Sequence, residues 1–164
     1  MITNYNLFLD DVRIPTHVKW VEIPANQHYS VVRNYKEFVD LITLRGLPKF
    51  VCYDHDLADC HYGHGLNNDA IPYDAYGKER TGYHCAMWLV NYCIERNVKH
   101  PPYIVHSLNP VGKKNIESYI ESYNKTLAEK CSSCLADVSN ASFKIVNTKI
   151  LCDTCVAELD NPSF

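Results

Sequence analysis

The chain has 164 residues, a net charge of −3 and 46% hydrophobic residues, which supplies a packed core and excludes a wholly disordered chain. The slightly negative charge argues against a broad phosphate-binding surface, so we expect no binding to duplex DNA. No apolar run approaches the roughly 18 residues of a membrane span, so no membrane partner is expected. The first six residues contain no basic side chain, which argues against a secretory signal and favours a cytoplasmic location.

Four short apolar runs predict β-strands, at residues 7–9, 30–33, 50–53 and 103–105. The connection 12–29 contains Pro15 and Pro24 and has no helical period, so it is predicted to be a loop with an extended piece at 18–23. The segment 57–80 is rich in Gly, His, Asn and Tyr, and its length suggests a lid or a binding loop.

Three segments have the spacing of amphipathic helices. The first begins after Asn34, which can cap it together with Glu37, and ends at Gly46. The second begins after Thr81, and the third follows Pro110. The residues expected to face inward are Phe38, Leu41 and Ile42 in the first helix, Trp88, Leu89, Tyr92 and Cys93 in the second, and Ile116, Tyr119, Ile120, Tyr123 and Leu127 in the third.

Alternating strands and helices predict an α/β fold with a parallel sheet and right-handed crossovers over residues 1–127, followed by a small module at 128–164. In such sheets, ligands bind outside the carboxyl ends of the strands. Three of the predicted strands end in polar residues that would meet at this edge. They are Asp10 and Asp11 after the first, Asp54 and Asp56 after the third, and His106, Ser107 and Asn109 after the fourth.

The acidic residues at this edge suit a divalent cation. Neighbouring carboxylates repel one another unless they share a cation, and Mg²⁺ or Mn²⁺ takes carboxylate oxygens, waters and substrate phosphate as ligands. The alternative for any single Asp is a role in capping a turn or helix. His106 can act as a general acid or base near neutral pH, and Arg13 can clamp a phosphate or be a solvated loop charge.

Four motifs in this order resemble those of the cyclic-phosphate-processing receiver family over roughly residues 6–125. They are Leu9-Asp10-Asp11-x-Arg13-x-Pro15, Tyr53-Asp54-His55-Asp56-Leu57, Thr81-Gly82-Tyr83 and His106-Ser107-x-Asn109-Pro110-x-Gly112. The resemblance implies a receiver-like (flavodoxin-like) sheet flanked by helices, and activity on cyclic phosphates or nucleotide-derived substrates. The chain is more distantly similar to response-regulator receivers, in which positions matching Asp10 and Asp11 bind Mg²⁺ and the position matching Asp54 accepts a phosphoryl group.

Some features depart from response regulators. A loop replaces the helix between the first two strands, and no fifth strand carrying a Lys precedes the C-terminal module, although Lys113 or Lys114 could substitute. His106 and Asp56 are not receiver features. These departures disfavour a phosphorelay and favour turnover of a phosphate ester.

We therefore expect a metal-dependent phosphohydrolase or phosphodiesterase that acts on a small cyclic-phosphate or nucleotide-like substrate. The alternatives are a non-catalytic module that binds phosphate ligands or partners, and a phosphoacceptor that uses Asp54. The expected residues are Asp54, His106 and Ser107 for catalysis, Arg13, Asn109 and Thr81 for substrate binding, and Asp10, Asp11 and Asp56 for a divalent cation.

The eight cysteines comprise four single residues and two close pairs. Cys131 and Cys134 are separated by 17 residues from Cys152 and Cys155, a spacing typical of a structural Zn²⁺ site of the ribbon or treble-clef kind. A hairpin is expected between the pairs, over 141–146 and 148–151, and the module could contact a protein partner. Cys52, Cys85 and Cys93 are expected to be reduced and buried, and no cysteine stands where a papain-like nucleophile would need it.

The loop 57–80 leaves three interpretations open. Cys60, His61 and His64, with His55 and His84 nearby, could bind a transition metal, contact substrate or be solvated. Tyr62, Tyr73 and Tyr76 could stack on a nucleobase or anchor the loop.

Overall fold

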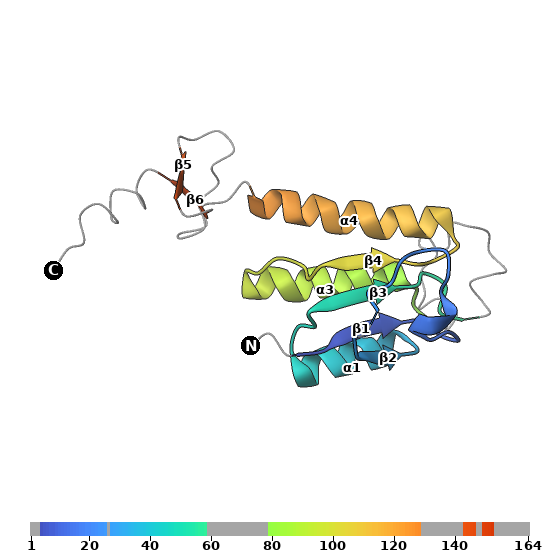
Figure 1. Cartoon of the computed structure of the whole chain (residues 1–164). Coiled ribbons are helices and arrows are strands. Elements are labelled where there is room, and N and C mark those ends of the chain that lie inside the picture. The colour runs from blue at the N-terminus through green and yellow to red at the C-terminus, as the bar shows by residue number, and fades with distance from the viewer. Residues whose placement is uncertain (1–3, 26, 59–78, 129–142, 147–148, 153–164) are drawn as a thin grey trace. The chain divides into compact units, whose positions relative to one another are not determined.

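The computed structural model describes residues 4–25, 27–58, 79–128, 143–146 and 149–152 (Figure 1). The chain divides into two compact units, Met1–Ile120 and Glu121–Phe164. No helix in the described part of the chain is long and apolar enough to cross a membrane.

The first unit is built on a four-stranded parallel sheet. Its strands are β1 (Asn6–Leu9), β2 (Tyr29–Val32), β3 (Phe50–Tyr53) and β4 (Tyr103–Val105), in the spatial order β2-β1-β3-β4. The predicted parallel sheet is confirmed, and its order is that of a flavodoxin-like receiver fold up to the fourth strand. In residues 106–120, the described remainder of this unit, no fifth strand follows β4.

The three helices begin where the sequence predicts, and the first also ends at the predicted residue. In α1 (Tyr35–Arg45), the Asn34 side chain accepts a hydrogen bond from the Glu37 N–H at 2.8 Å, and Gly46 ends the helix with a positive φ of 78°. Helix α3 (Gly82–Arg96) begins after Thr81, and α4 (Pro110–Ala128) begins at the proline that follows Asn109. The buried face of α3 differs from the predicted one, because Trp88 and Tyr92 are only half-buried. That face consists of Gly82, Cys85, Ala86, Leu89, Val90 and Cys93.

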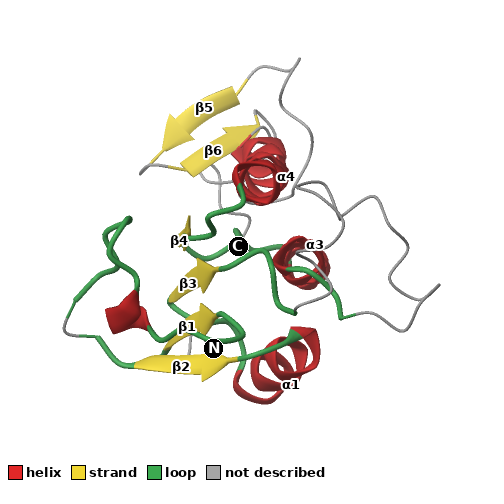
Figure 2. Cartoon of the chain, turned by 90° about the vertical axis from the view of Figure 1, so that its right-hand side faces the viewer, coloured by secondary structure: helices red, strands yellow, loops and turns green. Residues whose placement is uncertain are grey.

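The two faces of the sheet are covered differently. Helices α1 and α3 lie on one face (Figure 2). There the centroid of the Phe38 ring lies 5.9 Å from that of the Tyr53 ring. The connection between β1 and β2 covers the other face, and its Val18 packs in a core with Phe8 and Cys52. The connection, predicted to be a loop with an extended piece at 18–23, holds a short 3-10 helix at Pro15–His17, and residues 18–23 have no regular secondary structure. Val18, Val21 and Ile23 cover this face of the sheet with apolar side chains, as the side chains of a helix would, although they lie in an irregular connection.

The described part of the second unit is an antiparallel hairpin of β5 (Phe143–Val146) and β6 (Lys149–Cys152). Its register pairs Val146 with Lys149 beside the turn and Phe143 with Cys152 at the far end. The hairpin expected between the two cysteine pairs is therefore confirmed.

Candidate functional site

The register of the sheet places three predicted site residues in one row. Asp10, Asp54 and His106 each follow the last residue of a strand, and the strand ends Leu9, Tyr53 and Val105 lie side by side. Each of the three continues the ladder by one hydrogen bond. The backbone N–H groups of Asp10, Asp54 and His106 donate to Val32 (3.1 Å), Leu9 (2.9 Å) and Tyr53 (2.9 Å), respectively.

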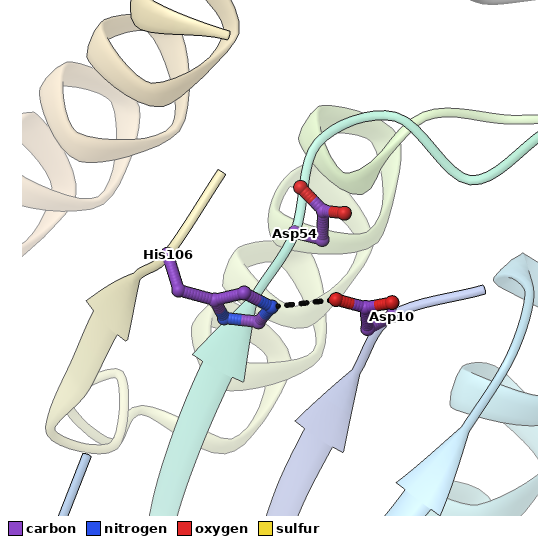
Figure 3. A group of neighbouring side chains, drawn as sticks. All are labelled: Asp10, Asp54 and His106. Carbon is purple, nitrogen blue, oxygen red and sulfur yellow. Dashed lines mark hydrogen bonds and ion pairs between the residues drawn. The ribbon is translucent and has the colours of Figure 1, made fainter. Parts of the chain in front are cut away.

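These three side chains form a buried cluster (Figure 3). One potential ligand atom from each lies within 4.8 Å of the other two, and His106 Nε2 is 3.1 Å from Asp10 Oδ2. Phe8 stacks on the His106 ring, with centroids 4.6 Å apart and planes at 11°. The cluster thus joins two carboxylates and one imidazole at the carboxyl ends of β1, β3 and β4.

Asp10 is held in its ionised form. Burial pushes its pKa upward, but hydrogen bonds from the His106 side chain and from the backbone N–H groups of Arg13 and Val12 outweigh burial and lower the pKa. Because a carboxylate only accepts hydrogen bonds, Nε2 of His106 carries the proton in this contact. Asp10 therefore fixes both the orientation and the tautomer of the imidazole.

The pKa values of the other two acids, Asp54 and Asp11, are raised and not lowered. Burial raises the pKa of Asp54, against the opposing effect of a hydrogen bond with the Ser107 side chain. Burial also raises the pKa of Asp11, with a further contribution from the charges of Asp10 and Asp54. Within the described residues, the buried Oδ1 atom of Asp11 has no hydrogen-bond partner. The site therefore concentrates more negative charge than its own contacts neutralise.

Arg13 belongs to the site rather than to the solvated surface. Its Nη1 lies 3.2 Å from Asp54 Oδ2 and 3.4 Å from Asp10 Oδ2, so one guanidinium bridges both carboxylates. Arg33 supports this arrangement by donating to the backbone carbonyls of Asp10 and Arg13. The structure thus places a cationic group with a forked donor directly at the acidic cluster.

The remaining predicted site residues take part in capping and in neighbouring contacts. Asn109 caps α4, because its Oδ1 accepts from the Gly112 N–H at 2.9 Å, and Ser107 Oγ accepts from the Asn109 N–H at 3.2 Å. Asp56 Oδ1 lies 2.9 Å from His55 Nδ1 and is not one of the three clustered ligands. Thr81 caps α3, with its N–H donating to His84 Nδ1 at 3.2 Å. The metal role of Asp56 and the substrate roles of Asn109 and Thr81 remain predictions.

Gly82 and Gly112, which were not predicted to be site residues, allow two helices to pack closely against the end of β3. A Cβ atom on Gly82 would lie 1.8 Å from the Asp54 carbonyl oxygen, and one on Gly112 would lie 2.2 Å from the His55 ring. Gly82 also donates its N–H to the His55 carbonyl at 2.7 Å. Helices α3 and α4 can therefore approach the end of β3 this closely only because Gly82 and Gly112 have no side chain. The sequence did mark both glycines, because they belong to the motifs Thr81-Gly82-Tyr83 and His106-Ser107-x-Asn109-Pro110-x-Gly112.

Trp20 also contacts the site, although it was not predicted to do so. Its indole Nε1 donates to the backbone carbonyl of His106 at 2.7 Å, although the two residues are 86 positions apart. Nothing in the local sequence signals this contact, since the connection has no regular period.

Some predicted residues lie outside the described part of the chain. They are Cys60, His61, Tyr62, His64, Tyr73 and Tyr76 of the 57–80 loop, together with Cys131, Cys134 and Cys155 of the zinc quartet. Cys152 lies in β6, but the structure does not describe its side chain.

Comparison with known proteins gives one match. The family described as Cyclic-phosphate processing Receiver domain matches residues 5–122, which is more than half of the chain and includes β1 to β4 and the whole acidic cluster. No curated protein and no solved structure matches the chain. The protein therefore belongs to the family of cyclic-phosphate-processing receiver domains.

Proposed function

We propose that this protein is a metal-dependent phosphohydrolase or phosphodiesterase acting on a small cyclic-phosphate or nucleotide-like substrate. The observation that carries the proposal is the buried cluster of Asp10, Asp54 and His106 at the carboxyl edge of the sheet. Membership in a family described by cyclic-phosphate processing supports the substrate class.

The residues present fit a divalent cation. Asp10 and Asp54 offer carboxylate oxygens, and the buried Asp11 Oδ1, which lacks a hydrogen-bond partner within the described residues, offers another. A bound cation would also relieve the burial and repulsion that raise the pKa values of Asp11 and Asp54. Such an ion would polarise a phosphoryl oxygen.

The chain's own residues supply the rest of the reaction. Arg13 exchanges its contacts with Asp10 and Asp54 for two phosphate oxygens, which its fork matches. Water attacks phosphorus and the P–O bond of the ester breaks. One proton of the water passes through the Asp10–His106 pair to the departing oxygen, so the imidazole is neutral before and after the step, and Asp10 holds the ring in the orientation that this requires. Ser107, hydrogen-bonded to Asp54, holds that carboxylate in place.

A non-catalytic phosphate-binding module is the second candidate, and the Arg13 bridge is the observation that favours it. The Arg13 guanidinium already pairs with Asp10 and Asp54, and it could bind a phosphate ligand at this site without a metal ion. A phosphoacceptor role is disfavoured. The Asp54 side chain is only 3% exposed, and Lys113 pairs with Glu117 on its own helix at 3.8 Å.

We also propose that Cys131, Cys134, Cys152 and Cys155 hold one structural Zn²⁺. Two thiolate pairs close a tetrahedral site and leave no position for a substrate. The hairpin β5–β6 stands between the pairs in the sequence, as a ribbon or treble-clef module requires. Its role would be to stabilise the C-terminal unit or to bind a partner protein.

The test is turnover by the full-length, zinc-loaded protein. A panel of cyclic and linear nucleotide phosphates is incubated with Mn²⁺ or Mg²⁺, with EDTA controls, and the products are followed by mass spectrometry. We expect metal-dependent cleavage that is lost in Asp54→Asn and kept in Asp40→Asn, which removes an exposed acid on α1 that pairs with Lys36. If the protein retains a nucleotide phosphate but cleaves none of them with either metal ion, it is instead a non-catalytic phosphate-binding module.

A further inference from the structure

Trp20 is an exposed indole with a fixed orientation. The residue is 45% exposed, yet its Nε1 is anchored 2.7 Å from the carbonyl oxygen of His106, a residue of the buried cluster. The anchor lies directly at the site, because the same His106 stacks on Phe8 and contacts Asp10 through its side chain. A large aromatic surface is therefore presented to solvent beside the acidic cluster, with little freedom to turn away.

Trp20 and the acidic cluster share one charged neighbour. The guanidinium carbon of Arg13 lies 5.4 Å from the centroid of the Trp20 ring, while Nη1 of the same group contacts Asp54 and Asp10. A phosphate that takes up the donors of Arg13 would thus be bound close to the indole. A ligand that used both contacts would need an anionic end and a flat apolar end.

Further apolar side chains are exposed on the same loops. Val12 is 74% exposed and follows Asp11 in the β1–β2 connection, and Leu108 is 65% exposed and follows Ser107 in the β4–α4 connection. These two connections are also the ones that carry Arg13, Trp20 and Asn109. An apolar contribution to ligand binding is therefore available from both sides of the row of site residues.

We propose that Trp20 is the stacking surface for the base of a nucleotide-like substrate, whose phosphate is bound by Arg13 and the Asp10–Asp54–His106 cluster. This inference rests on the proposed function and narrows its substrate class to phosphates that carry an aromatic heterocycle. An indole stacks on any flat base, so Trp20 selects for the presence of a base and not for its identity. Its fixed orientation limits the conformational entropy lost on binding.

Fluorescence gives a direct test, because Trp20 and Trp88 are the only two tryptophans of the sequence. In Trp88→Phe, Trp20 is the sole indole. Adenosine 3′-monophosphate, which has the form of a product of cyclic-phosphate hydrolysis, is titrated into this variant with Mg²⁺, and mass spectrometry verifies that it is intact after the titration. Ribose 3-phosphate serves as the matched ligand without a base. We expect saturable quenching of Trp20 by the nucleotide and none by the sugar phosphate.

Affinities measured by calorimetry separate stacking from a purely structural role. We expect Trp20→Leu to weaken nucleotide binding by about 5- to 150-fold and to leave binding of ribose 3-phosphate unchanged. Leu44→Ala, which removes another exposed apolar side chain at 83% exposure on α1, should alter neither affinity. Circular dichroism checks that each variant is folded.

The possible failures are distinguishable. Equal affinity of the wild-type protein for both ligands without quenching, or equal weakening of both in Trp20→Leu, overturns the stacking role. In the second case Trp20 only positions Arg13, and in both cases the proposed function stands. Absence of saturable binding of either ligand overturns the proposed function together with this inference.

Discussion

Nε2 of His106 lies 3.1 Å from Oδ2 of Asp10, between two buried residues that are 96 positions apart in the chain. The contact depends on the register of the sheet, because each residue stands one position beyond the end of its strand. A slip of one residue in either strand would turn one of these side chains to the opposite face. The chemistry of the site is therefore specified by the packing of β1, β3 and β4.

Asp54→Asn should lower the activity of the protein without lowering its stability. The pKa of Asp54 is raised mainly by burial, so its charged form is disfavoured in the metal-free fold. An amide of the same shape removes that cost. We expect the free energy of unfolding in EDTA at neutral pH to be unchanged or higher, while metal-dependent turnover falls by about a hundredfold or more. Urea denaturation and the turnover assay measure the two effects, and unaltered turnover would remove Asp54 from the mechanism.

Alanine at Gly82 or Gly112 should be strongly destabilising. The added Cβ would meet the Asp54 carbonyl at 1.8 Å or the His55 ring at 2.2 Å, and neither the backbone nor a fully buried ring can yield cheaply. We expect a loss of about 3 kcal/mol in the free energy of unfolding for each variant. Intrinsic helix propensity predicts the opposite sign, since alanine is favoured over glycine within helices.

The matched control for these substitutions is Ser118→Ala, at an exposed position in α4. It should change the free energy of unfolding by less than about 0.5 kcal/mol. If Gly112→Ala were as stable as this control, the close packing of α4 on His55 would be refuted.

His100 should make the protein sensitive to acid. Its Nδ1–H donates to the Pro101 carbonyl at 2.7 Å, and its Nε2 accepts from the Tyr53 hydroxyl at 3.0 Å, so the buried ring is neutral. Burial lowers its pKa to about 4, against a smaller opposing effect of the Pro101 hydrogen bond. The unfolded chain therefore binds a proton near pH 6.5 that the folded chain rejects until pH 4.

Stability should consequently fall by about 3 kcal/mol as the pH drops from about 6.5 to about 4. Urea denaturation across this range measures the slope. His100→Gln can still form hydrogen bonds but does not titrate, so its profile should lack this component. Identical slopes in the two proteins would show that His100 is not the responsible group.

Metal removal should affect the two proposed metal sites differently. Elemental analysis is expected to find about one tightly bound zinc per chain, which Cys131→Ser abolishes and Asp54→Asn retains. The cation at the acidic cluster should exchange freely with EDTA. Zinc retained at full occupancy in Cys131→Ser would contradict the cysteine assignment.

The sequence predicted those features that depend on local pattern. Capping by Asn34, the stop at Gly46 and the short apolar runs defined the elements of the first unit, and polar strand ends pointed to the cluster. Features that depend on tertiary distances were out of reach. The Trp20–His106 hydrogen bond, the double contact of Arg13 and the packing of Gly112 on His55 join residues whose separation along the chain carries no signal.

Residues 18–23 show a second limit of prediction from the sequence. This segment was predicted to contain an extended piece within a loop, and its apolar residues cover the sheet face from a connection without regular secondary structure. Apolar spacing indicates which side chains are buried, and a half-buried irregular segment can have the same spacing as a strand. In α3, Trp88 and Tyr92 are only half-buried although their spacing resembles that of Leu89 and Cys93, so spacing alone did not separate the buried face from its margin.

Hydrolysis of a cyclic nucleotide phosphate in ¹⁸O-labelled water, with Mn²⁺, with Mg²⁺ and with EDTA, tests the proposed activity most directly. We expect a single labelled oxygen to enter the product phosphate only when a divalent cation is present, and we expect Asp54→Asn to abolish this incorporation. An intact cyclic phosphate after prolonged incubation with either metal, bound equally well in EDTA, would contradict the account and identify a phosphate-binding module.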